Sequence, residues 1–274
     1  MKNSLSYKSY IRSPYYSIKH TTYFDVYDEL FFSYRNKKIT FVEIGVYGGG
    51  SLFMWRNFFG PKARIIGIDL DPNAKKWEKF GFEIFIGNQS SHSFWNKVKK
   101  KIGKIDIALD DGGHTYEQQI VTTECLLDQI KNGGLLVVED THTSYMNHFG
   151  PKKYSFVEYT KKMIDKVNSR SSLLYGKESD TRIWSIQIYE SIVAFKINKK
   201  ASSLLSKLID NSGIKDNAKD LRHADNYAMQ KIDTFIKLNI FIKYIPGWKI
   251  VYRSLRYIFI KNKFSAKKYF NSFF

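Results

Sequence analysis

Two short acidic clusters in the sequence each combine carboxylates with a histidine. They are Asp110-Asp111-Gly112-Gly113-His114 and Glu139-Asp140-Thr141-His142. Carboxylates that lie together repel one another unless a cation neutralises them. Because oxygen donors without cysteine favour a hard ion, the clusters predict a site for Mg²⁺ or another divalent cation. Side chains alternate along a strand, so only one of Asp110 and Asp111 should face the ion. We assign the metal ligands to Asp111, Glu139 and Asp140.

His114 follows Asp111 after two glycines. An imidazole at this position could remove a proton from a hydroxyl held against the metal, so we assign His114 and Asp111 as the catalytic residues. A structural role is the alternative for both, because strand-end acids often cap the next helix and a single histidine is often only a surface residue.

A second candidate site is the glycine-rich turn at 45–50, which follows a short apolar run. Such a turn lets backbone approach a ligand closely, where a Cβ would block it. A phosphate-binding P-loop is excluded because Ser51 stands where that motif needs lysine,. The dinucleotide pattern Gly-x-Gly-x-x-Gly is also absent, which leaves NAD as a weak alternative.

Two acids near this turn favour S-adenosylmethionine (SAM) over NAD. Glu43 stands inside a run that should be apolar, and the amino group of a methionine-type ligand can supply the partner that a buried carboxylate needs, through backbone or water,. Asp69 ends the next strand and can accept both ribose hydroxyls. The alternative is that the glycine-rich turn and Asp69 bind no ligand. The expected cofactor contacts are Glu43, Gly45, Gly48, Gly49, Ser51, Asp69, Asn88, Gln89 and Asp110.

The elements that must position these residues alternate between strands and helices. Short runs rich in Ile, Val and Phe predict strands, with helical patterns between them. Such a series gives right-handed crossovers and a parallel sheet with helices on both faces. Only Tyr189 and Glu190 separate the last two strands, which predicts an antiparallel hairpin at one edge,. The predicted strands are 40–45, 64–69, 82–86, 105–110, 135–139, 183–188 and 191–197.

The predicted fold class is therefore α/β: a Rossmann-like, seven-stranded, mostly parallel sheet with an antiparallel edge hairpin, and a helical C-terminal extension. An amphipathic helix within 23–34 should cover the sheet,. The expected division is an N-terminal segment with this cover helix at 1–38, a catalytic domain at 39–200 and a basic helical extension at 201–274. Polar, aperiodic stretches predict loops at 171–180 and 211–220,.

Composition narrows the classes of protein that the chain can be. A hydrophobic content of 43% excludes global disorder,. The single cysteine, Cys125, excludes an intramolecular disulfide and a multi-thiolate metal site, and it fits a cytoplasmic setting,. We expect Cys125 to be a buried structural residue. The sequence contains no stretch of 18 uncharged apolar residues, so it predicts no membrane span,.

The net charge of +18 suggests nucleic acid or anionic lipid as a partner, but the ends of the chain carry most of it,. Residues 1–20 hold four basic side chains and 241–274 hold eight, with no acidic ones in either segment. The remainder has 32 basic against 26 acidic residues. The core therefore need not be an electropositive groove, and nucleic acid is not favoured as a partner.

The basic C-terminal end at 241–274 predicts an amphipathic helix. On a helical wheel its apolar residues share one face, with a basic band alongside. Such a helix suits the anionic inner face of the cytoplasmic membrane. Packing on the core or on a second subunit of a homo-oligomer is the alternative. The apolar face consists of Trp248, Val251, Tyr252, Leu255, Ile258 and Phe259, and the basic band of Lys249, Arg253, Arg256 and Lys263.

Three motifs resemble the metal-dependent sugar O-methyltransferases related to the macrolide glycoside enzymes. They are Glu-Ile-Gly-Val-x-Gly-Gly-Gly-Ser, Asp-Asp-Gly-Gly-His and Gly-Gly-Leu-Leu-Val-Val-Glu-Asp-Thr-His-Thr-Ser-Tyr, within 21–197. The resemblance implies that Asp111, Glu139 and Asp140 hold Mg²⁺ and that His114 is the base. Relatives often have Gly-Asp-Gln near the adenine, where this chain has Gly87-Asn88-Gln89.

The resemblance implies transfer of a methyl group from SAM to a sugar hydroxyl. We expect the acceptor to be a bacterial surface glycan, which can be lipid-linked, or a glycosylated metabolite. His142 and Tyr145 are the expected substrate contacts. Mg²⁺ beside two sugar hydroxyls would lower the pKa of one of them, and His114 could accept its proton.

Three other functions compete with this prediction. A nucleic-acid methyltransferase that acts on amino groups would carry adjacent prolines, and no two of the five prolines are adjacent. A catalytically silent glycan- or lipid-binding scaffold would not need the acid cluster. An NAD-dependent sugar oxidoreductase would need a Tyr-x-x-x-Lys pair, and the four pairs with that spacing all lie outside the strand–helix core.

Overall fold

The computed structural model describes residues 3–171, 174, 178–214, 221, 226–262, 266 and 269. The chain divides into two compact units, Met1–Leu208 and Ile209–Phe274, which we describe separately. The loops predicted at 171–180 and 211–220 lie partly outside the described residues.

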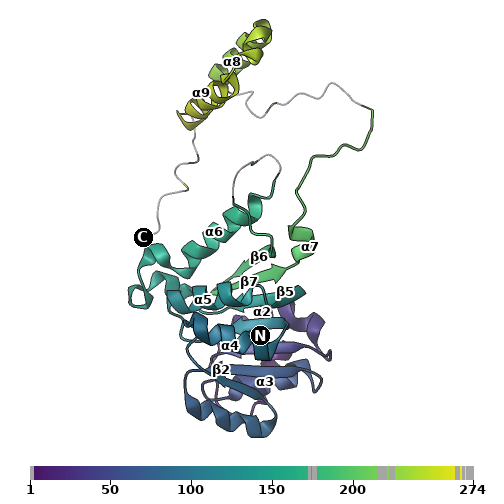
Figure 1. The fold of residues 1–274 in the computed structure, drawn as a ribbon, viewed down its shortest axis with the longest axis vertical. Helices are drawn as coiled ribbons and strands as arrows, with labels where there is room; N and C mark the ends of the chain where they lie inside the picture. Colours follow the sequence, from purple (N-terminus) through teal and green to yellow (C-terminus); the bar gives the residue numbers. More distant parts are fainter. Residues whose placement is uncertain are drawn as a thin grey trace. The chain divides into compact units, whose positions relative to one another are not determined.

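One seven-stranded sheet forms the centre of the first unit, with helices around it (Figure 1). The strand order is β3-β2-β1-β4-β5-β7-β6. β1 to β5 run parallel, whereas β7 is antiparallel to both β5 and β6. The strand order reverses between β1 and β4, which creates a crevice at their carboxyl ends. The strands are β1 (Thr40–Ile44), β2 (Arg64–Asp69), β3 (Glu83–Ile86), β4 (Ile105–Asp110), β5 (Ile130–Val138), β6 (Ile183–Tyr189) and β7 (Ile192–Ile197).

This architecture confirms the predicted fold class, including the antiparallel edge hairpin. The largest difference in bounds is at β5, which begins at Ile130 because that residue already pairs with Ile105 of β4. β5 ends at Val138, so Glu139 follows the strand instead of ending it, and Asp140 comes after both.

Alternating side chains along the strands build two apolar cores, one on each face of the sheet. Phe41 belongs to the core that includes side chains of α2 and α3 and against which α1 packs, and its neighbour Val42 belongs to the core that includes side chains of α4, α5 and α6. Trp55 and Trp95, both fully buried, lie in the first and the second core respectively. The helices of this unit are α1 (Leu5–Ile11), α2 (Tyr23–Phe31), α3 (Gly50–Phe59), α4 (His92–Ile102), α5 (Tyr116–Leu126), α6 (Phe156–Asn168) and α7 (Lys199–Ser202).

Short 3₁₀ helices complete the connections of the first unit, and the start of α5 fixes a loop beside the crevice. Thr115 caps α5 in a capping box with Gln118, so the loop after β4 ends at a defined residue,. Cys125 is buried in α5, as predicted. The 3₁₀ helices are η1 (Phe32–Tyr34), η2 (Pro72–Phe80), η3 (Thr141–Tyr145), η4 (Asn147–Phe149) and η5 (Lys152–Tyr154).

The second unit contains α8 (Tyr227–Leu238), η6 (Ile240–Tyr244) and α9 (Trp248–Asn262). α9 contacts α8, where Tyr252 donates a hydrogen bond to Asp233 at 2.7 Å. The predicted apolar face of α9 is thus used in part inside this unit, while Val251 and Ile258 remain 48% and 49% exposed. Lys263 lies outside the described residues. None of the described helices is long and apolar enough to cross a membrane.

Candidate active site

A cavity of about 790 Å³ lies at the carboxyl ends of β1, β2, β4 and β5. Its volume is in the range of ligand pockets, and its position is where open α/β sheets bind their ligands. The residues that line it include most of the predicted site together with an N-terminal stretch, 16–20, that the motifs do not include.

Three of the glycines at 45–50 allow close contacts with other backbone segments of the same chain. A Cβ on Gly45 would lie 2.0 Å from the Asp111 carbonyl oxygen, and one on Gly48 would lie 2.6 Å from that of Tyr16. Gly50 donates a hydrogen bond from its N–H to the Tyr16 carbonyl at 3.1 Å. The sequence predicts that these glycines allow a ligand to approach the backbone closely. At Gly48 and Gly50 the N-terminal segment makes this close approach instead.

Gly49 has a left-handed backbone with φ 79°, and a Cβ there would lie 2.2 Å from the Trp77 ring. Gly49 packs against Trp77 and does not line the cavity, whereas the sequence predicts a cofactor contact there. Gly45, Gly48 and Ser51 do line the cavity.

Asp69 lies at the end of β2 and holds the glycine turn in place. One of its oxygens accepts from the backbone N–H groups of Val46 and Tyr47, at 2.9 and 3.0 Å, and the other accepts from Asp71 at 2.8 Å. A carboxylate has about four lone-pair sites, so Asp69 keeps capacity for a further donor from the cavity that it lines,.

Glu43 is fully buried and does not line the cavity. Its carboxylate accepts hydrogen bonds from Ser51 Oγ and Trp55 Nε1, both at 2.8 Å. Burial raises the pKa of Glu43 to about 7, against the lowering effects of Lys19 and these two donors. Ser51 and Trp55 therefore supply the hydrogen-bond partners of Glu43 that we expected from a ligand. A contact between Glu43 and a ligand would pass through Ser51, which lines the cavity.

Asp110 and Asp111 face opposite ways, as the strand period predicts. Asp110 is buried behind the cavity and accepts from Gln89 Nε2 at 2.9 Å, while the other end of Gln89 accepts from the Gly113 N–H at 3.1 Å. Burial raises the pKa of Asp110 to about 7. Asp110 thus positions Gln89 instead of lining the cavity, whereas Asn88 and Gln89 both line it.

The acid cluster already contains a cation, the ammonium group of Lys19. Its Nζ lies 2.5 Å from Asp111 Oδ2 and 2.9 Å from Glu139 Oε2, and its side chain is only 2% exposed. Burial by itself would lower the pKa of Lys19, but the Asp111 and Glu139 carboxylates raise it well above its usual value. Burial also raises the pKa of Glu139, and Lys19 opposes that shift.

Two tyrosines of α2 complete the cluster. Tyr27 donates its hydroxyl hydrogen bond to Glu139 Oε1 at 2.6 Å, and Tyr23 donates to Asp140 Oδ1 at 2.5 Å. Burial, followed by the neighbouring carboxylate, raises the pKa of each tyrosine. Both hydroxyls therefore remain protonated donors that hold the acids in place.

His114 lies at the open side of this cluster, with Nε2 3.2 Å from Asp140 Oδ2 and 3.9 Å from Asp111 Oδ1. His114 and Asp140 both have left-handed backbones, with φ 57° and 55°. Such conformations are uncommon outside glycine and gather at functional sites. Thr143 supports both residues, because its hydroxyl contacts their two carbonyl oxygens at 3.2 and 2.8 Å.

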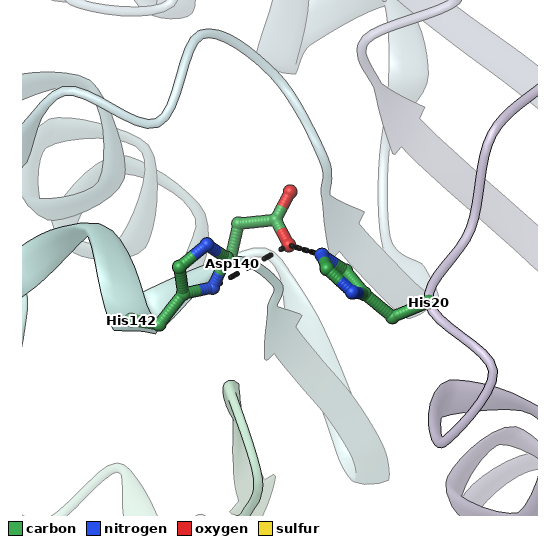
Figure 2. Close-up of side chains that lie close together, drawn as sticks. All are labelled: His20, Asp140 and His142. Carbon is green, nitrogen blue, oxygen red and sulfur yellow. Dashed lines mark ion pairs between the residues drawn. The ribbon is translucent and has the colours of Figure 1, made fainter.

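The second oxygen of Asp140 faces two further histidines, His20 and His142 (Figure 2). Their ring nitrogens lie 3.6 and 3.9 Å from Asp140 Oδ1. His142 Nδ1 also contacts the Ser191 hydroxyl closely. His142 therefore lies beside the acid cluster, although it does not line the cavity, and Tyr145 of η3 is exposed.

Sequence reasoning missed Lys19, His20 and the hydroxyl groups of Tyr23 and Tyr27. The helical spacing of Tyr23 and Tyr27 predicted only that they cover the sheet. Their tyrosine hydroxyls were the available signal, because a buried tyrosine usually needs an acceptor. Lys19 stands in an aperiodic segment, where the sequence carries no sign of a partner 92 and 120 residues away.

The residues present fit a hard divalent cation in part. Ligand atoms of Asp111, His114 and Asp140 all lie within 4.8 Å of one another, and two of the three residues offer carboxylate oxygens,. Glu139, the third predicted ligand, is engaged by Lys19 and Tyr27. His114 Nδ1 is buried without a hydrogen-bond partner in the described part of the chain. For the cofactor, the cavity offers polar groups from Asp69, Asn88 and Gln89 beside apolar walls.

The sheet order, the glycine turn after β1 and the acids after β4 and β5 define a Rossmann-like methyltransferase fold. Residues 42–141 match the family model of a methyltransferase domain. The resemblance noted from the motifs is therefore confirmed for this segment.

Two curated relatives are similar to part of this chain. The chain is 34% identical over 131 residues to mycinamicin VI 2''-O-methyltransferase of Micromonospora griseorubida, a match that covers 45% of this chain and 32% of the relative. It is 33% identical over 135 residues to 8-demethyl-8-alpha-L-rhamnosyl tetracenomycin-C 2'-O-methyltransferase of Streptomyces olivaceus, covering 47% and 35%. The chain thus spans about a third of the length of these relatives.

Among solved structures, the chain is similar to the MycE methyltransferase from the mycinamycin biosynthetic pathway, in complex with Mg and S-adenosylhomocysteine (SAH). The TM-score is 0.62 at 26% identity, and the match covers 71% of this chain and 53% of that one. A further structure of MycE contains mycinamycin VI together with Mg and SAH.

Proposed function

We propose that this chain is a SAM- and Mg²⁺-dependent O-methyltransferase that acts on a sugar hydroxyl. The observation that carries the proposal is that one cavity has Asp69 and the glycine turn among its lining residues together with Asp111, His114 and Asp140. A methyl donor and an acceptor hydroxyl could therefore lie side by side, as an in-line displacement requires. The relatives support the same chemistry, because both are named as O-methyltransferases and one of them is named for a rhamnosyl compound.

On this proposal each set of residues has one task. The cofactor is held by the glycine turn together with Asp69, Asn88 and Gln89. The cation would be held by oxygens of Asp111 and Asp140. Glu139 would be the third ligand once Lys19 releases it. Bound SAM would supply the methyl group, and Mg²⁺ would lower the pKa of the acceptor hydroxyl. His114, whose Nε2 faces Asp111 and Asp140, accepts the proton of that hydroxyl,.

The acceptor is a sugar attached to a larger molecule. The relatives, which are named for mycinamicin and tetracenomycin glycosides, support a glycosylated metabolite. A bacterial surface glycan, which can be lipid-linked, is the alternative acceptor that the basic end of the chain favours. In that case the enzyme would work at the inner face of the cytoplasmic membrane. We also propose the functional division at 1–38, 39–200 and 201–274, with the middle segment as catalytic domain.

Methyl transfer from labelled SAM to a panel of glycosides tests this proposal. Transfer to a sugar hydroxyl should require Mg²⁺, so that EDTA abolishes it and added Mg²⁺ restores it. Identification of the methylated position by mass spectrometry and NMR would define the sugar. Full transfer in EDTA would remove the metal from the proposal, and transfer to RNA or DNA instead of glycosides would contradict the substrate class.

A further inference from the structure

The N-terminal stretch 13–20 lies against the cavity, which its residues 16–20 line, and we refer to it as the strap. α1 precedes it and α2 follows it, so both of its ends are fixed. Tyr15 anchors its first half, with its ring 4.5 Å from that of Trp77. The glycine turn has no Cβ atoms at Gly48 and Gly50, and this allows the strap to lie directly on the turn.

The second half of the strap, residues 16–20, delivers Lys19 into the acid cluster. The Lys19 ammonium contacts one oxygen of Asp111 and one of Glu139, two of the three carboxylates predicted to bind Mg²⁺. It also lies 5.7 Å from the centre of the Tyr27 ring. Lys19 thus occupies the position in which those two acids would meet a metal ion.

An ammonium group and a divalent cation cannot share these oxygens without strong repulsion, because both are positively charged and the side chains of Lys19 and Glu139 are buried,. Removal of Lys19 without a replacement would leave buried carboxylates unpaired, which is strongly unfavourable. A divalent cation that binds these two oxygens would therefore replace Lys19. The strap can allow this exchange, since Tyr16 and Ile18 are mostly exposed and only a few hydrogen bonds hold its second half,.

We propose that Lys19 is the resident counter-ion of the acid cluster and competes with the divalent cation for Asp111 and Glu139. Metal binding displaces Lys19 and with it residues 16–20 of the strap. The strap thereby sets the metal affinity, and residues 16–20 move away from the cavity wall when the metal enters. This inference rests on the proposed metal centre, but it concerns cation binding and not methyl transfer.

Binding of Mn²⁺ to the full chain, followed by electron paramagnetic resonance of the free ion, tests the competition. Lys19→Met should bind Mn²⁺ at least about tenfold more tightly than the wild type, which is about 1.4 kcal/mol. Lys19→Arg keeps the charge and should bind no more tightly than the wild type. Lys8→Met, which removes an exposed lysine of α1, is the matched control. Equal or weaker binding by Lys19→Met would overturn the proposal.

A second measurement uses the wild-type chain and so does not depend on how a variant folds. Acetylation by a water-soluble succinimidyl ester should leave Lys19 protected in EDTA, because it is 2% exposed. Saturating Mn²⁺ should make Lys19 reactive, as shown by mass spectrometry of its peptide, with Lys8 reactive in both conditions. Protection of Lys19 at saturating Mn²⁺ would contradict displacement.

Calorimetry with SAH on the same samples separates the two proposals. SAH binding together with a Mn²⁺ affinity that Lys19→Met leaves unchanged would overturn the role of Lys19 alone. Absence of both SAH and Mn²⁺ binding in the wild type and in Lys19→Met would overturn the proposed function as well.

Discussion

His114 and Asp140 face each other across the mouth of the acid cluster, with 3.2 Å between Nε2 and Oδ2, and both have left-handed backbones. Each follows a different strand, β4 or β5, and Thr143 joins their carbonyl oxygens. Two uncommon conformations held against each other indicate that the position of the imidazole is fixed by the fold. Nε2 is thereby held toward Asp140 and Asp111, while Nδ1 is buried.

Substitution of His114 should impair the chemical step without affecting cofactor binding. His114→Ala should lower turnover by about 10² or more, because it removes the proposed base, while SAH affinity stays nearly unchanged. Steady-state kinetics and calorimetry give the two values. His148→Ala, a histidine of η4 that does not line the cavity, is the control. Wild-type turnover in His114→Ala would rule out the histidine as base.

Glu43 should make the stability of the wild type depend on pH. Its pKa is about 7 in the folded chain, mainly because of burial, against an ordinary value of 4.5. Its protonated form therefore favours the folded state, and this contribution is fully present below about pH 4.5 and lost as the pH rises through 7. Each pKa unit corresponds to about 1.4 kcal/mol, so the loss is on the order of 3 kcal/mol at most.

Glu43→Gln keeps the shape of the side chain but cannot ionise. Its free energy of unfolding should therefore fall less than that of the wild type between pH 5 and pH 8, as measured by urea denaturation. Glu158→Gln, a more exposed acid on α6, should keep the wild-type slope. Identical pH slopes for Glu43→Gln and the wild type would show that Glu43 does not titrate in this range.

The fold could be predicted from the sequence because its signals are local. Each buried strand is a short apolar run, and the two-residue separation before β7 allows only a hairpin,. The bounds of β5 were less accurate, because Ile130 joins the strand through pairing with Ile105, a contact that periodicity does not reveal.

The candidate site was predictable where a residue's neighbours follow from the sheet, and not where they come from the N-terminal segment. Asp111 and Asp140 come together because both follow the carboxyl ends of adjacent parallel strands. Lys19 reaches them from a loop without periodicity, and Glu43 finds its partners on α3. A negative cluster predicts a cation but does not tell whether that cation is a metal ion or an ammonium group.

The C-terminal helix α9 gives a prediction about membranes. Val251 and Ile258 remain about half exposed beside Arg253, and such a surface should bind anionic lipid, with about 1 kcal/mol from each basic residue,. The full chain should float with anionic liposomes at low salt, and a chain that ends at Tyr244 should not. Neutral liposomes are the control. Equal flotation of the two chains, or none of either, would favour a contact with a second subunit.

The most direct test of the account is calorimetric titration of the full chain with SAH and, separately, with NADH. We predict that SAH binds and NADH does not. Asp69→Asn should weaken SAH binding by roughly 1 to 3 kcal/mol through loss of a charge-assisted hydrogen bond. Asp165→Asn, an exposed acid of α6, should bind SAH like the wild type. Binding of NADH without binding of SAH would contradict the assignment of this cavity to SAM.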